Sequence, residues 1–523
     1  MIIGPIAPAV KRFYKRFLSD APGVGVWAGL ALPILLHGLL LAVKRHSLQT
    51  LGEATMLHWL CAGSVCRWLA RLRFPVDRWH EHALKRFLAI AARLDDQRDW
   101  VLIFDGTDTK RGGLTKIQNT RNYGKKRKKK KGGRPSTTTH TFVLGLLVLP
   151  CGVRLPLPRK SWCTRAYAKS QKLPYKTQIQ LAEELLRWLR PLLPTDRSVV
   201  VLADSYFEGQ ALFKLCNDWD YTFISKLKSN RAFAGAPGQR IVAYGKALAQ
   251  DKFRRRRLCR GKEATASYRR QPPRQPQAHE KRVYDYYSEC RLVSTLGEAQ
   301  VVYSWKTPAY TPTPRQDRRQ FAALVTNNRK LSAAKVVEYY ELRWQIEVFF
   351  RELKGQLGLQ DYQGTKFGSY ERYVTLTLLG YMVLEYQRWR GLRGQAKREE
   401  PRGGWTSART ATLLAQVRQE ATVADVRWIE QRLKTRGGRR QLRQALRRGQ
   451  GGPKAAGQAR SERARRPKQT QRIEQRLKTR GGRRQLRQAL RRGKGGPKAA
   501  GQARSERARR PKQTQRRDQI PAE

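Results

Sequence analysis

Hydrophobic and polar positions alternate with a helical period in the segment 340–354, YELRWQIEVFFRELK. On a helix, four of its polar side chains fall within about 60° of one another: Tyr340, Arg343, Glu347 and Lys354. Leucine, isoleucine and phenylalanine form a separate apolar arc, and a third arc holds Glu341, Gln345 and Glu352. The pattern predicts an amphipathic helix over residues 332–359, with Ser332 as its N-cap. Its polar stripe could be a solvated surface with i,i+4 ion pairs or a site for a metal ion beside a phosphate.

Short apolar runs upstream of this helix predict strands. Residues 99–104 lead into Asp105, residues 198–203 lead into Asp204, and residues 139–157 predict a hairpin. The order strand, strand, strand, helix, strand, helix is that of a ribonuclease H-like core. In that topology the acids that end the first and fourth strands meet at one edge of the sheet. We therefore expect an α/β fold with Asp105 and Asp204 close together.

Composition divides the rest of the folded chain. Residues 1–95 predict a helical domain, and a helix–turn–helix pattern at 47–72 would suit docking on DNA. The core is expected to comprise residues 96–228 and 329–395, interrupted by an Arg-rich, β-rich insertion over residues 229–328.

The C-terminal tail, residues 396–523, is rich in Arg, Gln, Gly and Ala. Residues 429–472 recur as residues 473–516 with a single difference, Gln450 against Lys494. Such near identity indicates a recent duplication of the coding sequence rather than a diverged solenoid. The composition predicts disorder, or folding only upon binding a polyanion.

The net charge of +68 at pH 7 predicts binding to polyanions through counterion release. DNA is the expected partner, and an anionic membrane surface is the alternative because residues 21–43 carry no formal charge. Four glycines, two prolines and His37 within that run favour buried helices over a membrane span. Seven scattered cysteines without a CxxC pair exclude a zinc ribbon and a disulfide framework, and favour a reducing, intracellular compartment.

Three acids are candidate metal ligands: Asp105, Asp204 and Glu347. Carboxylate oxygens are what Mg²⁺ and Mn²⁺ prefer, and two such ions can support in-line phosphoryl transfer. No Walker A loop, Rossmann fingerprint or nucleophile elbow is present. A strand-terminal Asp is more often a turn former or a helix cap. Asp108, expected in the loop after the strand, is the alternative to Asp105.

Tyr340, Arg343, Glu347 and Lys354 form the pattern Y-(x2)-R-(x3)-E-(x6)-K. This pattern resembles the signature of the DDE transposases typified by insertion sequence 4, and Asp105 and Asp204 look like the other two acids of that family. The resemblance covers about residues 20–395. It implies a ribonuclease H-like core with a β-rich insertion, whose three acids hold Mg²⁺ or Mn²⁺, expected as two ions.

The resemblance further implies an enzyme that nicks transposon ends and joins the freed 3′-hydroxyl to target DNA. Tyr340, Arg343 and Lys354 would grip DNA near the cleaved end, and whether a hairpin end forms stays open. The expected partners are terminal inverted repeats and target DNA, with a homodimer on DNA and no membrane. The expected location is the bacterial cytoplasm, in association with the nucleoid.

Seven consecutive cations, residues 125–131, follow the first acid. Lys125, Lys126, Arg127 and Lys128 are expected to contact DNA phosphates, with a solvated loop as the alternative. Trp162 and Trp305 are candidates for base stacking, although packing is the commoner role. The duplicated tail departs from the family, so a catalytically inactive relic that binds DNA remains the alternative function.

Overall fold

The computed structural model describes the chain in two compact units, residues 3–424 and residues 1–2 with 425–523. The described residues are 6–23, 26–42, 46, 51, 65, 68–70, 74–91, 99–111, 117–123, 137–195, 197–259, 281–307, 320–396, 407–440 and 442. The basic run 125–131 and most of the predicted helix–turn–helix lie outside them, as do the tail beyond residue 442 and the whole second repeat.

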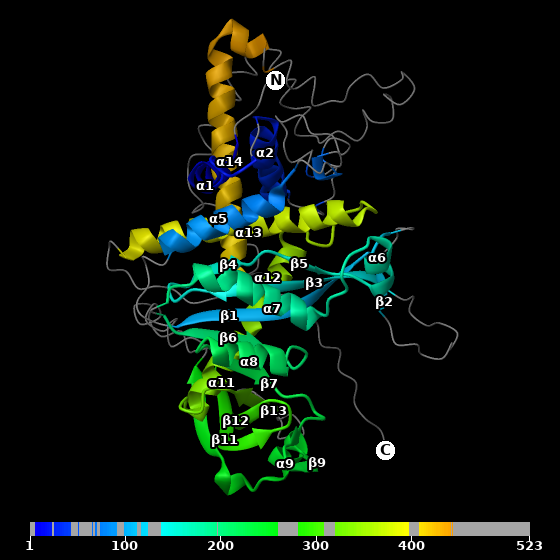
Figure 1. Ribbon diagram of the computed structural model, residues 1–523. Helices are drawn as coiled ribbons and strands as arrows, with labels where there is room; N and C mark the ends of the chain where they lie inside the picture. Colours follow the sequence, from blue (N-terminus) through cyan, green and yellow to red (C-terminus); the bar gives the residue numbers. More distant parts are fainter. Residues whose placement is uncertain are drawn as a thin grey trace, which may run out of the picture. The chain divides into compact units, whose positions relative to one another are not determined.

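The fold is mixed α/β, built on one large mixed sheet (Figure 1). Its strands are β1 (Trp100–Lys110), β2 (Arg121–Tyr123), β3 (Thr137–Val148), β4 (Arg154–Pro156), β5 (Lys160–Trp162), β6 (Val199–Ala203), β7 (Thr222–Lys226), β8 (Ala232–Phe233), β9 (Ala236–Arg240), β10 (Arg254–Cys259), β11 (Lys281–Val293), β12 (Gly297–Thr307) and β13 (Gln320–Thr326). The path runs β2-β3-β1-β6-β7-β13-β12-β11-β8-β9. Strands β1, β6 and β7 are parallel neighbours, whereas β3 and β13 pair with them antiparallel.

The helices are α1 (Pro8–Phe17), α2 (Val26–Leu41), α5 (Val76–Ala91), α6 (Arg165–Ser170), α7 (Gln178–Leu189), α8 (Gln210–Asp218), α9 (Ile241–Ala247), α11 (Ala333–Leu342), α12 (Trp344–Gly355), α13 (Phe367–Ala396) and α14 (Ser407–Lys434), with 3-10 turns at Arg190–Leu192 and Gln250–Lys252. Helix α7 packs on β3 and β5, and α12 packs on β1. Successive residues of a strand point to opposite faces of the sheet. A Cβ at Gly106 would meet Gln178 of α7, whereas the neighbouring Asp105 faces Arg343 beside α12. Helices α7 and α12 therefore lie on opposite faces of the sheet.

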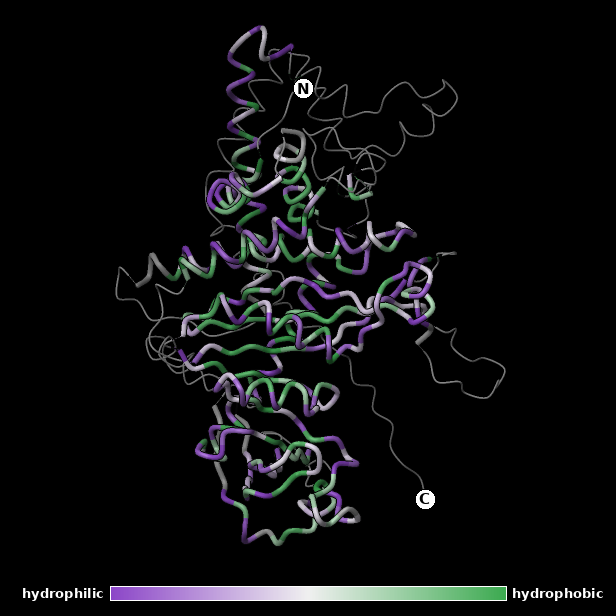
Figure 2. Tube along the Cα trace, in the orientation of Figure 1, coloured by the Kyte–Doolittle hydropathy of each residue, from purple (hydrophilic) through white to green (hydrophobic). Residues whose placement is uncertain are grey.

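Green hydrophobic segments follow the central strands in Figure 2, where the core lies. Strands β1 and β6 are buried along residues 100–104 and 199–203. Helices α1, α2 and α5 pack against the long helix α13, which agrees with the buried helices expected near the N-terminus. Among the described helices, none is long and apolar enough to cross a membrane.

The amphipathic helix predicted over residues 332–359 is broken in the structure. Ser332 is its N-cap as expected, since its hydroxyl accepts the Lys335 N–H at 3.3 Å. The chain then tightens at Arg343, whose N–H bonds the Tyr340 carbonyl at 3.1 Å, so α11 ends and α12 begins there. Helix α12 ends at Gly355, before a turn in which Leu359 N–H bonds the Leu353 carbonyl and Gly358 has φ +65°.

Two other expectations were wrong. Strand β1 does not end at residue 104 but continues to Lys110, because β3 pairs with it through that residue; Asp105 and Asp108 are therefore strand residues. The prediction of a disordered tail fails for α14, where Leu414, Val417 and Ala421 are buried at helical spacing. Strands predicted at 282–293 and 300–305 are confirmed as β11 and β12.

Candidate active site

Two acids lie side by side where the parallel pairing of strands β1 and β6 ends. Strands β1 and β6 pair in parallel up to Phe104 and Ala203. Asp105 and Asp204 are the next residues of the two chains, so the sheet register brings them together. The Asp204 carboxylate accepts the Tyr206 N–H at 2.8 Å, which turns the chain sharply away from the sheet.

The third acid, Glu347, reaches this edge from the first turn of α12. Arg343 links it to the strand: its guanidinium lies 3.8 Å from the Asp105 carboxylate and donates to the Glu347 carboxylate at 2.5 Å. The side chains of Asp105 and Arg343 are only 18% and 16% exposed, so this pairing is largely shielded from water. One arginine therefore connects an acid of the sheet with the acid of the helix.

The other polar residues of the helical stripe, Tyr340 and Lys354, also lie close to Asp105. The Arg343 guanidinium carbon lies 5.8 Å from the centre of the Tyr340 ring. Burial raises the pKa of Tyr340, and the charges of Asp204 and Asp105 add to this effect. Burial lowers the pKa of Lys354, while Asp108 and Asp105 partly restore it. The stripe is therefore part of the acidic edge rather than a solvated surface.

The site concentrates negative charge. Burial first, and then the Asp204 carboxylate, raise the pKa of Asp105 to about 7, and Glu347 contributes in the same direction. The Gly106 N–H, which donates to Asp105 at 2.7 Å, and Arg343 oppose this rise. Like charges held together in a partly dry site favour either a proton or a cation.

Residues 174–383 match the family model described as the transposase DDE domain. The chain carries a transposase DDE domain. The match includes Asp204, Glu347 and the whole polar stripe, and begins after Asp105. It implies a ribonuclease H-like core, as the strand order around β1, β6 and β7 had indicated. No curated protein matches the chain.

The donor chemistry of the DDE domain fits a hard divalent ion, because Asp105, Asp204 and Glu347 all offer carboxylate oxygens. Among the described residues, however, no three acidic, histidine or cysteine side chains are already close enough to hold a metal. Arg343 pairs with both Asp105 and Glu347 in this arrangement. Ion binding would therefore require the Arg343 side chain to release at least one carboxylate.

Asp108, the alternative to Asp105, is engaged elsewhere. Its carboxylate accepts from Arg121 at 2.8 and 2.9 Å and from the Thr141 hydroxyl at 2.6 Å. These contacts tie β1 to β2 and β3 and occupy its oxygens. Asp108 is therefore held within the sheet, whereas Asp105 lies beside Asp204.

The remaining candidates divide between packing and undescribed segments. Trp162 lies under the Arg121 guanidinium at 5.3 Å, and Trp305 packs on Phe321 with ring centres 4.9 Å apart. Both thus have packing partners, the commoner role for such residues. Lys125, Lys126, Arg127 and Lys128 lie outside the described residues.

Sequence reasoning missed a buried charge cluster behind α12. Glu352 is 1% exposed and bonds Arg154, which is fully buried on β4, at 3.0 Å. Glu385 of α13 lies 3.5 Å from the same guanidinium. The signal was present, since Glu352 falls in the third helical arc, away from both the polar stripe and the apolar face.

Proposed function

We propose that this protein is a transposase that binds the ends of its own element and catalyses metal-dependent DNA cleavage and strand transfer. The observation that carries the proposal is the meeting of Asp105 and Asp204 at one sheet edge, with Glu347 joined to Asp105 through Arg343. The family match over the DDE domain supports the same class of chemistry.

Asp105, Asp204 and Glu347 would hold Mg²⁺ or Mn²⁺, expected as two ions. When bound, the ions supply activation of a water or 3′-hydroxyl and stabilisation of the leaving oxygen. The elevated pKa of Asp105 means that this carboxylate gives up a proton when it binds a cation near neutral pH. The residues beside Asp105 on this sheet edge would set the positions of the three carboxylates.

Tyr340, Arg343 and Lys354 would contact the DNA strand near the cleaved phosphate. Arg343 is suited to two roles, because a guanidinium that leaves a carboxylate can grip a phosphate with the same fork of donors. Its release to DNA would open the acids to the ions. Substrate and metal would thus favour the same rearrangement.

The wider chain would hold DNA by charge. The loop with Lys125, Lys126, Arg127 and Lys128 and the basic tail would contribute phosphate contacts, and the N-terminal helices would bind the inverted repeats. Paired ends imply a homodimer on DNA, in the bacterial cytoplasm at the nucleoid, without a membrane role.

The test is nicking of a supercoiled plasmid that carries the inverted repeats flanking this gene, with Mg²⁺ or Mn²⁺. Asp204→Asn and Glu347→Gln should each lower the nicking rate by at least about a hundredfold. The matched control is Glu338→Gln, a carboxylate on α11 that faces Lys335 at 3.8 Å, and it should nick at the wild-type rate. Wild-type nicking by both site variants would overturn the proposal.

An inactive, DNA-binding relic is the second candidate, and the near-identical tail repeat favours it. It predicts a gel shift with the inverted repeats but no nicking by the wild-type protein in either metal. If the wild-type protein nicks DNA and Glu347→Gln abolishes the nicking, the inactive-relic hypothesis is refuted.

A further inference from the structure

A second feature lies next along the same sheet edge. Strand β7 runs parallel to β6, with Ala203 opposite Ser225, and the Ser225 hydroxyl donates to the Asp204 carbonyl at 3.0 Å. The chain leaving β7 therefore emerges beside Asp204. It forms a turn that carries Lys228 and Arg231 before it enters β8.

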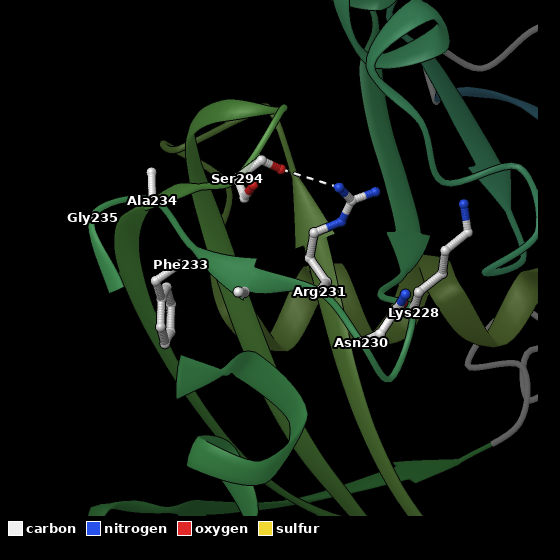
Figure 3. Close-up of a pocket in the computed structure, with 8 residues that line it drawn as sticks. Lys228, Asn230, Arg231, Phe233, Ala234, Gly235 and Ser294 are labelled. Atoms are coloured by element: carbon white, nitrogen blue, oxygen red, sulfur yellow. Dashed lines mark hydrogen bonds between the residues drawn. The ribbon is translucent and has the colours of Figure 1, made fainter. Parts of the chain in front are cut away.

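This turn lines a pocket of about 710 Å³ (Figure 3). Its lining comprises Lys228, Asn230, Arg231, Ala232, Phe233, Ala234, Gly235 and Ser294. Figure 3 shows the side chains of Lys228 and Arg231 rising from the turn on the same side. Gly235 has φ +79°, and nothing lies within 4 Å of the place where its side chain would begin, so a ligand can approach the backbone there.

The two cations are fixed in place by a fully buried carboxylate. Glu208, four residues after Asp204, pairs with Arg231 at 2.7 Å and lies 3.8 Å from the Lys228 ammonium. Lys228 also donates to the Glu208 carbonyl at 3.0 Å, and Arg231 donates to the Ser294 carbonyl at 3.2 Å. Two cations against one carboxylate leave a net positive charge, already oriented before a ligand arrives.

The wall of the pocket offers no free aromatic face. Phe233 is 2% exposed, and the Arg291 guanidinium lies over its ring at 4.1 Å. A base would therefore find no platform for stacking, whereas an anionic oxygen would find an ammonium and a guanidinium, with the exposed Asn230 amide nearby. The chemistry selects a phosphodiester rather than a base.

We infer that the Lys228–Arg231 turn holds one backbone phosphate of the DNA strand that passes Asp204, and so sets the register of that strand at the acids. The inference rests on the proposed function for the identity of the DNA. A phosphate fixed beside β7 would place a neighbouring linkage at the end of β6, because the two strands are parallel and adjacent.

The experiment is a methylphosphonate scan of a duplex carrying the element's inverted repeat. Each phosphate near the cleavage point is made neutral in turn, and binding by the full-length protein is measured without divalent ions. Wild type should lose about tenfold in affinity at the contacted position. Lys228→Gln should bind the unmodified duplex more weakly and lose its sensitivity at that one position, and Lys228→Arg should restore the sensitivity.

The matched control is Lys214→Gln, an exposed lysine on α8, which should keep the wild-type scan at every position. Asn230→Ala leaves the ion pairs of Glu208 intact. It should reduce the sensitivity to a neutral linkage at the same position, but to a smaller extent than Lys228→Gln. A Lys228→Gln scan identical to that of wild type, or a wild-type scan with no sensitive position, would overturn the inference. The scan measures binding and needs no cleavage. If the protein cannot nick DNA but shows one position whose sensitivity depends on Lys228, the proposed activity is refuted and the phosphate contact is not.

Discussion

The buried charges behind α12 allow a quantitative prediction. Arg154 donates to Glu352 at 3.0 Å, and its backbone N–H donates to Glu385 at 2.9 Å. Tyr381 donates to the same Glu352 oxygen at 3.0 Å. Arg388, 3.3 Å from Glu385, completes a set of two cations and two anions, each at most 6% exposed.

Glu352→Gln keeps the volume of the side chain and removes one of the two negative charges. The cluster is then left with an uncompensated cation in a site without water access. Removing one partner of a buried ion pair typically costs about 3–5 kcal/mol. That is a large share of the roughly 5–15 kcal/mol by which a domain is stable. Because Glu347 lies on the same helix, nicking should fall with the population of folded protein.

The assay is urea unfolding followed by tryptophan fluorescence, with Glu338→Gln on α11 as the control. The control should lie within about 0.5 kcal/mol of wild type. Arg154→Met combined with Glu352→Gln should recover much of the loss, because it leaves Glu385 and Arg388 as a balanced pair. A cost below about 1 kcal/mol for Glu352→Gln, or a double variant less stable than the single one, would refute the reasoning.

Three further predictions concern the acidic edge and the helix ends. Burial and the Asp204 carboxylate raise the pKa of Asp105 from its ordinary value of 3.8 to about 7, so the contribution of Asp105 to stability falls as pH rises between these values. In urea unfolding without metal ions, the free energy of unfolding of Asp105→Asn should rise relative to that of wild type as pH increases across that window, by up to about 4 kcal/mol. A difference in unfolding free energy that does not change with pH would contradict this. Gly358→Ala should lower the unfolding free energy by about 1–2 kcal/mol or more, because φ is +65° and the new Cβ would lie 2.3 Å from His46; an unchanged urea midpoint would argue against it. Thr177→Ala should cost about 1 kcal/mol by the same measurement, because it removes the capping box of α7; Thr177→Ser is its control and should retain most of the stability.

Local patterns in the sequence were enough for several elements. The Ser332 cap, the strands that lead into Asp105 and Asp204, and the shared stripe of Tyr340 and Glu347 all follow from residue spacing. Each depends on interactions within a few residues, such as a cap or the alternation of faces along a strand. The fixed spacing of the stripe also pointed to the family that the domain match supports.

Other features depended on chain segments far apart. The length of β1 was set by its partner β3, and the break at Arg343 coincides with its links to Asp105 and Glu347. The Arg154–Glu352 pair joins residues 198 positions apart.

The physical reason is that periodicity shows which face of a helix or strand is apolar, but not what covers it. A charged residue off the polar stripe, such as Glu352, looks the same in sequence whether it faces water or a buried arginine. The sequence alone predicted which side chains are candidates for the chemistry of this protein. The tertiary structure decided which of them meet, because sheet register and helix packing bring Asp105, Asp204 and Glu347 to one edge.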